Sequence, residues 1–312
     1  MAAYLIRRLW QMIPTLAGVV LLVFILFHYF GNDPSVILAG QNATQEQIAA
    51  IRQQLGLDQP LYVQFWLYLK SILTFDWGRS WATNEAVSHI FATRLPNTLT
   101  VMLPILVLDT LLALPIAMWV AYRRGSLADR TIMVITTVAL SVSFLVYIIV
   151  GQYVFAFQLG WFPVQGWSDS VWTNLITYVP LPVMLAVVVG ISPQTRLYRS
   201  FFLDELGHDY VRTARAKGMT ESVVLFRHVL RNAAIPILTN IGLALPGIFV
   251  GSFLIEVFFS IPGLGREVLL AVNRSDYPVI QAVTVYLAVL TMVINLLTDV
   301  MYKIADPRVV LR

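Results

Sequence analysis

The residues of this 312-residue chain that could do chemistry fall into two groups. The first is a basic segment at 204–238, which contains Ala-Arg-Ala-Lys-Gly at 214–218. The second is a set of carboxylates in or near long apolar runs, namely Asp109, Glu256 and Asp299. A carboxylate at membrane depth is energetically costly, so each of these side chains is a candidate functional residue.

Enzyme signatures are absent from the sequence. None of the four histidines belongs to an H-E-x-x-H motif, no G-x-S-x-G nucleophile motif occurs, and no lysine lies in a phosphate-binding P-loop. The chain has no cysteine, which excludes disulfides, thiolate metal sites and thiol nucleophiles. We therefore expect no catalytic residue, no metal and no bound cofactor. ATP-driven work would need an ATPase on another chain.

The composition is that of a membrane protein. Hydrophobic residues make up 58% of the chain and charged residues 12%, whereas soluble domains have about 45–50% and about 25%. We do not expect nucleic-acid binding, because the lysines and arginines lie at the ends of apolar runs and not on one soluble face.

Six apolar runs are candidate transmembrane helices in an all-α integral membrane protein. They lie within 1–30, 98–122, 131–157, 176–191, 235–258 and 279–302. The remaining regions are a segment at 31–97, a polar loop at 192–234 within the 98–302 core, and a tail at 303–312. The tails and the loops on their side hold 15 of the 21 lysines and arginines, so the positive-inside rule predicts cytoplasmic N- and C-termini.

The region at 31–97 is predicted to form a small helical subdomain that lies on the outer face of the membrane that the chain spans. Asn32-Asp33-Pro34 should end the first span, because proline disfavours helical geometry in the residue before it. The expected helices cover 44–55, with Thr44 as N-cap, 61–74 and 84–94.

The loop at 192–234 contains seven basic and four acidic residues. Two simple interpretations are a solvated surface and a basic stripe on anionic lipid. Its pattern favours a third. Gly218 suits a helix C-terminus, because left-handed geometry costs glycine little, and Thr220 can cap a second helix at 221–232. Such a helix–glycine–helix unit, with alanines before the glycine, could sit in a groove on a partner.

Arg-Thr-Ala-Arg-Ala-Lys-Gly at 212–218, followed by Ile235-Pro236, resembles the cytoplasmic EAA loop of bacterial ABC importer permeases. The variant is that of the dipeptide/oligopeptide/nickel permease family. Further matches are Arg7-Arg8, Asp33-Pro34, 55–61, 78–80, 94–99, 159–164, 262–265, 276–279 and Asp306-Pro307-Arg308. The motifs extend over nearly the whole chain, and they resemble the first of the two permease subunits, which has the long first periplasmic loop.

The resemblance implies a type I ABC importer permease fold in the bacterial inner membrane, with six transmembrane helices and a helical periplasmic subdomain between the first two. It implies as partners, besides the lipid bilayer, a second homologous permease, two cytoplasmic ATPases that bind ATP, and a periplasmic substrate-binding protein. The residues implied to couple to the ATPases are Arg212, Thr213, Ala214, Arg215, Ala216, Lys217 and Gly218.

Some positions depart from the family pattern. Ser143 stands where a proline is usual in the third span, which leaves the kink of that span open. Asp109 stands where a small or apolar residue is usual. It could contact a cationic group of the substrate, hydrogen-bond a neighbouring helix, or be protonated. Glu256 and Asp299 match family positions and are candidates for the translocation path, although structural anchoring or helix pairing is the simpler role for both.

The leading functional hypothesis is an ATP-driven importer that works by alternating access. A secondary transporter driven by protons or sodium is the alternative, but the ionisable residues within the spans are few and form no relay. An intramembrane enzyme is a third class, for which no motif is present. The sequence leaves open whether the substrate is a dipeptide, a longer peptide, glutathione, a nickel chelate, an opine or a peptide-like antibiotic.

Overall fold

The computed structural model describes residues 2–29, 33–40 and 43–305, with side chains described within 7–300. The described residues form helices and loops, with one isolated β-bridge between Arg79 and Ala86. The predicted all-α class is therefore confirmed for this part of the chain. The Asp306-Pro307-Arg308 motif and Asn32 lie outside the described residues.

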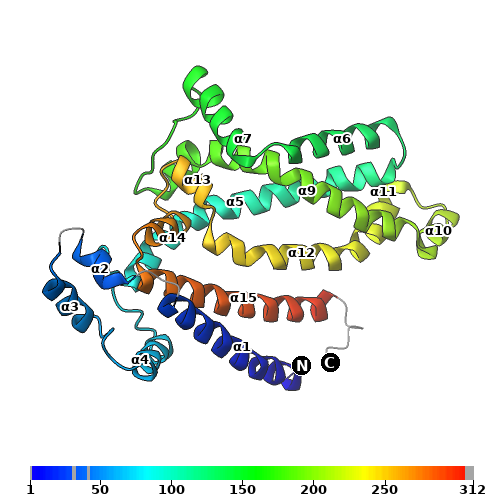
Figure 1. Cartoon of the computed structure of the whole chain (residues 1–312). Helices are drawn as coiled ribbons and strands as arrows, with labels where there is room; N and C mark the ends of the chain where they lie inside the picture. The colour runs from blue at the N-terminus through cyan, green and yellow to red at the C-terminus, as the bar shows by residue number, and fades with distance from the viewer. Residues whose placement is uncertain (1, 30–32, 41–42, 306–312) are drawn as a thin grey trace.

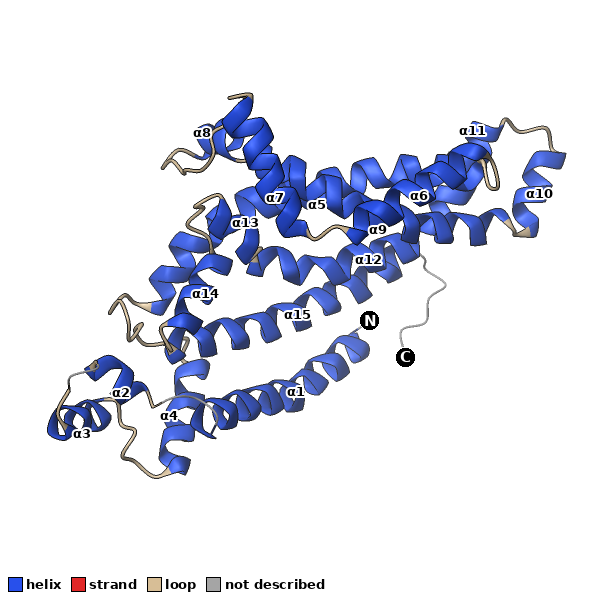
Figure 2. Cartoon of the chain, turned by 45° about the horizontal axis from the view of Figure 1, so that its top comes forward, coloured by secondary structure: helices blue, strands red, loops and turns tan. Residues whose placement is uncertain are grey.

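Long helices lie side by side and form the body of the molecule (Figures 1 and 2). They are α1 (Ala2–Tyr29), α5 (Val87–Tyr122), α9 (Pro180–Leu206), α12 (Leu230–Val250) and α15 (Tyr277–Ala305). Among the described residues, five helices are long and apolar enough to cross a membrane. The bent pair α6 (Leu127–Ser141) and α7 (Phe144–Gly151) with its π-helical extension η1 (Gln152–Gln158) would make a sixth.

Short elements lie at the two ends of these helices (Figure 1). The start of α1, the end of α15 and the short helix α10 (Asp209–Ala216) lie toward one end. The opposite end carries α2 (Pro34–Ala39), α3 (Gln45–Gln54), α4 (Leu61–Leu73), α8 (Val171–Thr173), α13 (Phe253–Phe258) and α14 (Leu264–Asn273). Which end faces the cytoplasm stays a prediction from the charge distribution.

The third predicted span, 131–157, is broken. α6 and the α7–η1 helix meet at an angle of 88°. Val142 (ψ 131°) and Ser143 (ψ 139°) both have extended backbones, so the helical hydrogen-bond ladder cannot continue through them. The kink that the sequence left open is therefore present without a proline.

Two other segments differ from the sequence-based prediction. The helix expected at 84–94 is not separate: it is the first part of α5, which contains Pro96 and continues into the second span. Val87 and Ile90 are buried beside α14, and this packing keeps the segment helical. The helix of the fourth span is also longer than predicted: α9 continues past the expected end at 191 and takes up the start of the loop expected at 192–234, as far as Leu206.

The region between α1 and α5 contains the expected helices α3 and α4. Thr44 is the N-cap of α3, as predicted, and it also forms a capping box with Gln47. Asp33 caps α2 through the backbone N–H of Ser35 and pairs with Arg52 of α3. Burial alone would raise the pKa of Asp33, but its hydrogen bonds with Ser35 and Arg52 outweigh that effect and lower it.

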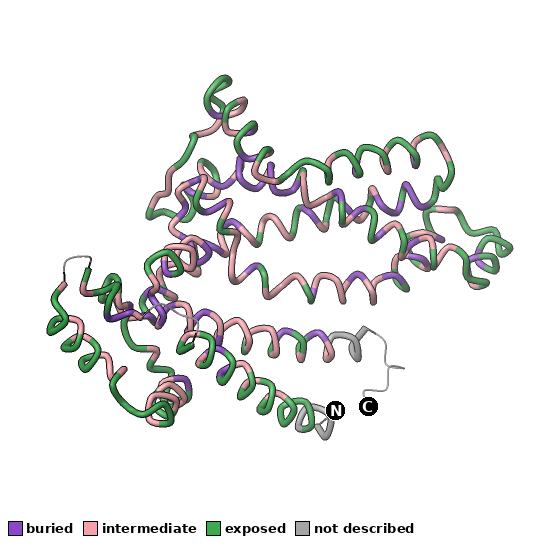
Figure 3. Tube along the Cα trace, in the orientation of Figure 1, coloured by how far each residue is buried: buried purple, intermediate pink, exposed green. Residues whose placement is uncertain are grey.

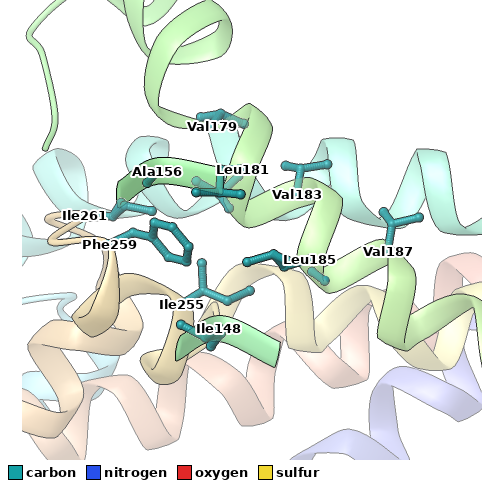
Figure 4. Close-up of a cluster of buried hydrophobic side chains, with 12 residues drawn as sticks. Ile148, Ala156, Val179, Leu181, Val183, Leu185, Val187, Ile255, Phe259 and Ile261 are labelled. Atoms are coloured by element: carbon teal, nitrogen blue, oxygen red, sulfur yellow. The ribbon is translucent and has the colours of Figure 1, made fainter. Parts of the chain in front are cut away.

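The best-buried part of the molecule is the contact between α5 and α9. Buried residues gather where these helices face each other, whereas α1 and α6 are exposed over most of their length (Figure 3). One buried cluster joins the first half of α9 to α7, α13 and the segment after α13 (Figure 4). Its labelled members are Ile148, Ala156, Val179, Leu181, Val183, Leu185, Val187, Ile255, Phe259 and Ile261.

α12 and α15 approach each other closely at Gly242. A Cβ atom at this position would lie 2.5 Å from Oγ1 of Thr298 on α15. Small residues at membrane helix contacts allow such close packing.

We expect Gly242→Ala to lower the free energy of unfolding by about 1–3 kcal/mol, because the new methyl group overpacks the contact with Thr298. The measurement is the midpoint of thermal unfolding in detergent. Gly247→Ala is the matched control on the same helix, where a Cβ would meet no atom within 4 Å. Adding Thr298→Ala should restore stability. Equal midpoints for the two glycine variants would contradict this packing argument.

Candidate functional site

The segment between α9 and α12 has the helix–glycine–helix form predicted from the sequence. α10 ends at Ala216, and Gly218 has a φ of +75°. The next helix begins at Glu221, with Thr220 before it in extended geometry but without a side-chain cap hydrogen bond. That helix does not end at Asn232: it continues through η3 (Val224–Val229) into α12.

α10 packs against the rest of the chain through one face. Val211 and Ala214 are buried in a cluster with Tyr198 and Phe202 of α9 and with Val224 of the following helix. Ala214 therefore faces inward and is not part of an open docking face, contrary to what the sequence suggested. The other residues of the predicted coupling core are exposed: Arg212, Thr213, Arg215, Ala216, Lys217 and Gly218.

An ion pair closes the turn around Gly218. Nε and Nη2 of Arg215 donate to the two carboxylate oxygens of Glu221, at 2.9 and 3.2 Å. Such a bidentate pair fixes the geometry of the two groups. Arg215 thus holds this turn closed, a role that was not predicted from the sequence. The available signal was the six-residue spacing of Arg215 and Glu221 across Gly218.

A second link joins α10 to the end of α9. The hydroxyl of Tyr210 donates to a carboxylate oxygen of Glu205. Burial, together with the nearby charge of Glu205, raises the pKa of Tyr210 to about 12, so its hydroxyl stays protonated and remains a donor at neutral pH. α10 is therefore fixed to both flanking helices.

Glu256 on α13 lies in a polar contact at the opposite end of the molecule. It is 1% exposed. Its Oε1 accepts from the hydroxyl of Thr98 at 2.9 Å, and its Oε2 accepts from the backbone N–H of Arg266 at 2.7 Å. The Thr98 oxygen in turn accepts from the N–H of Leu264 at 2.7 Å. Glu256 thus ties the α13–α14 turn to α5.

Glycines enclose the Glu256 carboxylate. A Cβ at Gly251 or Gly263 would collide with it, and one at Gly265 would lie 3.1 Å from Oε2. The Pro-Gly-Leu-Gly motif at 262–265 was therefore the sequence signal for this contact, although it could not identify Glu256 as the partner. These contacts agree with the anchoring role considered for Glu256.

Asp109 lies in the contact between α5 and α9. It is 8% exposed, and its carboxylate lies close to where a Cβ on Gly190 of α9 would be, 3.0 Å from Oδ2. Its Oδ1 has no hydrogen-bond partner among the described atoms. The neighbouring Tyr198 donates from its hydroxyl to Asn240 of α12 at 3.2 Å, so polar side chains from three helices lie in this region.

Asp299 near the end of α15 pairs with Arg8 of α1, with Nη2 and Oδ2 2.9 Å apart. In the described part of the chain, the three carboxylates have different neighbours. Asp109 lies beside Gly190, Glu256 contacts Thr98 and Arg266, and Asp299 pairs with Arg8. The structure therefore does not bring the three carboxylates into one site. Among the described residues, no group of three or more His, Cys, Asp or Glu side chains could hold a metal ion.

Two further polar links were not predicted from the sequence. Asp129 of α6 accepts two hydrogen bonds from Arg199 of α9, both at 2.8 Å. Asp276 before α15 accepts from the hydroxyl of Ser80 and from the N–H of Trp81, the latter at 3.0 Å. Both links join segments far apart in sequence, and no local pattern could have paired them.

The family of this chain follows from comparison with known proteins. Residues 113–311 match the model of the binding-protein-dependent transport system inner membrane component, and residues 1–102 match the model of the N-terminal part of the same membrane component. The chain therefore belongs to this family of ABC transporter permeases, which are multi-pass proteins of the inner membrane.

Two full-length relatives illustrate the similarity. The glutathione transport system permease protein GsiC of Salmonella typhimurium is 38% identical over 309 residues, which cover 99% of each chain. The probable peptide ABC transporter permease protein y4tP of Sinorhizobium fredii is 35% identical over 314 residues, again with 99% of each chain covered.

We expect Glu256→Ala to speed hydrogen exchange at the Arg266 amide and to lower the thermal midpoint. The substitution removes the acceptor of a buried N–H and a buried hydroxyl, and each unsatisfied group costs about 1–3 kcal/mol. Glu256→Gln, which keeps shape and one acceptor, should have a smaller effect.

The control is Glu267→Ala. The Glu267 carboxylate pairs with Arg94 at 3.6 Å, which is longer than the hydrogen bonds of Glu256, so its removal should have a smaller effect. Unchanged exchange at Arg266 in Glu256→Ala would rule out the anchoring role of Glu256.

Proposed function

We propose that this chain is the permease subunit of an ATP-driven, binding-protein-dependent importer that carries di- or oligopeptides, or a related peptide-like solute, into the cytoplasm. Full-length relatives named as glutathione and peptide permeases support the substrate class. The proposed mechanism rests on the packing of α10. Its basic face is exposed, and the helix is fixed to α9 and α12 through the buried Val211 and Ala214.

The exposed residues Arg212, Thr213, Lys217 and Gly218 form the surface on which a cytoplasmic ATPase would dock. Their family counterparts and the charge distribution of the chain support this assignment. Because Tyr210 and Arg215 tie α10 to its flanking helices, a displacement of α10 would move the ends of α9 and α12 together. A buried hydrophobic contact transmits such a movement better than a solvated loop would.

In this mechanism, ATP binding and hydrolysis on two partner ATPases alternate the permease between outward-open and inward-open states. Each nucleotide state must favour one permease conformation, because a ligand shifts an equilibrium only through its differential affinity for the two states. A second homologous permease would complete the pathway, and a periplasmic binding protein would deliver the substrate. Asp109, Glu256 and Asp299 remain candidates for residues along or beside the path.

Substrate recognition by Asp109 is the less favoured alternative. Its carboxylate packs against Gly190 of the same chain, with 8% of the residue exposed. A role in helix packing accounts for this position more simply than contact with a cationic substrate.

We expect Gly218→Val to reduce ATPase co-purification and solute uptake by tenfold or more. Valine disfavours the left-handed backbone at φ +75°, so the turn that positions α10 should be lost. Gly218→Asn should retain much of the activity, because asparagine tolerates this conformation. The measurements are co-purification of the ATPase and uptake of labelled dipeptide and glutathione into cells.

Gly125→Val is the matched control, because Gly125 has a φ of +79° and, as at Gly218, an added Cβ would meet no atom within 4 Å. Normal uptake and assembly in Gly218→Val would show the coupling assignment to be wrong. Uptake by this chain alone in vesicles, driven by a proton gradient, would instead support a secondary transporter.

We expect Asp109→Asn to lower uptake of lysine-containing and neutral peptides by the same factor, because the change removes charge but keeps the packing volume beside Gly190. The measurement is competitive uptake of the two peptide types by whole cells. A loss confined to the cationic peptide would place Asp109 in the substrate path.

A further inference from the structure

The α7–η1 helix projects sideways from the long helices at the end of the molecule that carries α13 (Figure 1). It meets α6 at 88°, whereas α6 packs against α9 and runs alongside it (Figures 1 and 2). A helix perpendicular to the membrane-crossing helices lies parallel to the membrane plane. The proposed coupling mechanism gives this helix no role.

The length of α6 places the start of α7–η1 near a membrane surface. α6 has 15 residues and is therefore about 22 Å long. The extended residues Val142 and Ser143 can add about 7 Å. Together they come close to the thickness of the hydrocarbon core, about 30 Å. α6 and these two residues can thus cross the core without α7–η1, which begins near the boundary on the α13 side.

Contacts with α9 and α13 fix the rotation of α7–η1 about its own axis. A Cβ at Gly151 would lie 2.5 Å from the Leu185 side chain of α9, so only glycine leaves room for that side chain. Nε2 of Gln152 donates to the carbonyl oxygens of Phe258, at the end of α13, and of Val164, both at 3.0 Å. The face opposite these contacts therefore stays exposed.

The exposed face of α7–η1 is apolar and carries one phenol hydroxyl. Its members are Val146, Ile149, Val150, Tyr153 and Phe157. Their spacing of mostly three and four residues puts them on one side of the helix. The rings of Tyr153 and Phe157 stack with their centroids 5.8 Å apart, and Phe157 is 72% exposed. The chain itself leaves this face uncovered along the whole helix.

The composition of this region favours lipid as the partner of the exposed face. Contacts between membrane helices are enriched in glycine, alanine, serine and threonine, and none of these lies on this face. From Phe144 to Tyr178 the only charged residue is Asp169, so the region offers little charge to a protein partner or to water. Trp161 and Trp172 are exposed in the segment that follows, and tryptophan is enriched where a membrane meets water.

We propose that α7–η1 is an interfacial helix that lies flat in the lipid leaflet on the α13 side. Its exposed face contacts acyl chains, and Trp161 and Trp172 lie beside it at the headgroup boundary. The third membrane crossing is then made by α6 alone. Because Leu185 and Gln152 link α7–η1 to α9 and α13, the helix holds this end of α9 at a fixed depth in the bilayer.

Spin labelling measures the depth of this helix, and a chain without cysteine is suited to single labels. The labelled variants are Val146→Cys, Val150→Cys and Phe157→Cys, which replace exposed side chains. Each is purified with the subunits that accompany it and placed in vesicles of phosphatidylcholine and phosphatidylglycerol. Power saturation with oxygen and with nickel-EDDA reports the depth of the nitroxide. We expect one depth at all three positions, with high oxygen and low nickel accessibility.

The matched control is the pair Leu127→Cys and Val138→Cys on α6, which are exposed and eleven residues apart, as 146 and 157 are. These two labels should differ in depth by about 16 Å. A difference of that size between 146 and 157 would overturn the proposal in favour of a span. High nickel accessibility at 157 would overturn it in favour of a face open to water. Low accessibility to both reagents would overturn it in favour of a face covered by another subunit.

Discussion

The packing of α9 against α5 is the contact on which the rest of the structure depends. Small residues of α5, Ala113 and Ala117, lie in one buried cluster with the large Tyr198 and Phe202 of α9. In a bilayer, helix association depends on close packing and polar contacts, because lipid is as apolar as the side chains. Gly190 gives α9 the space to accept the Asp109 carboxylate from α5. The two helices therefore form a rigid pair.

This pair connects the two ends of the molecule. The first half of α9 is buried with α7 and α13, and its last turns are buried with α10. A single uninterrupted helix, Pro180–Leu206, thus touches both the α13–α14 region and the proposed coupling surface. Long-range coupling needs a physical element that both regions contact, and α9 is such an element.

Polar contacts fix the segments that the helix pair does not hold. Glu256 ties the α13–α14 turn to Thr98, and Asp276 ties the loop before α5 to the start of α15. At the other end, Glu221 and Glu205 hold α10 through Arg215 and Tyr210. These carboxylates either accept two hydrogen bonds or lie beside a turn. The links therefore fix the relative positions of the segments they join as well as stabilising them.

Local patterns in the sequence predicted the local features well. The capping of α3 by Thr44 and the break at Gly218 were both found, because a cap or a left-handed turn depends on only a few adjacent residues. Helix ends were predicted less well. α5 starts earlier and α9 ends later than apolarity suggested, because packing of Ile90 and Phe202 keeps polar segments helical.

The sequence by itself determined that this is an all-helical membrane chain, where its apolar runs lie, and which motif marks the proposed coupling segment. These properties depend on composition and on short-range spacing. Only the tertiary structure decided that Ala214 faces inward, that Glu256 is enclosed by glycines, and that the third span bends by 88°. Such features depend on which distant segments come into contact, and one sequence does not encode that pairing in any local pattern.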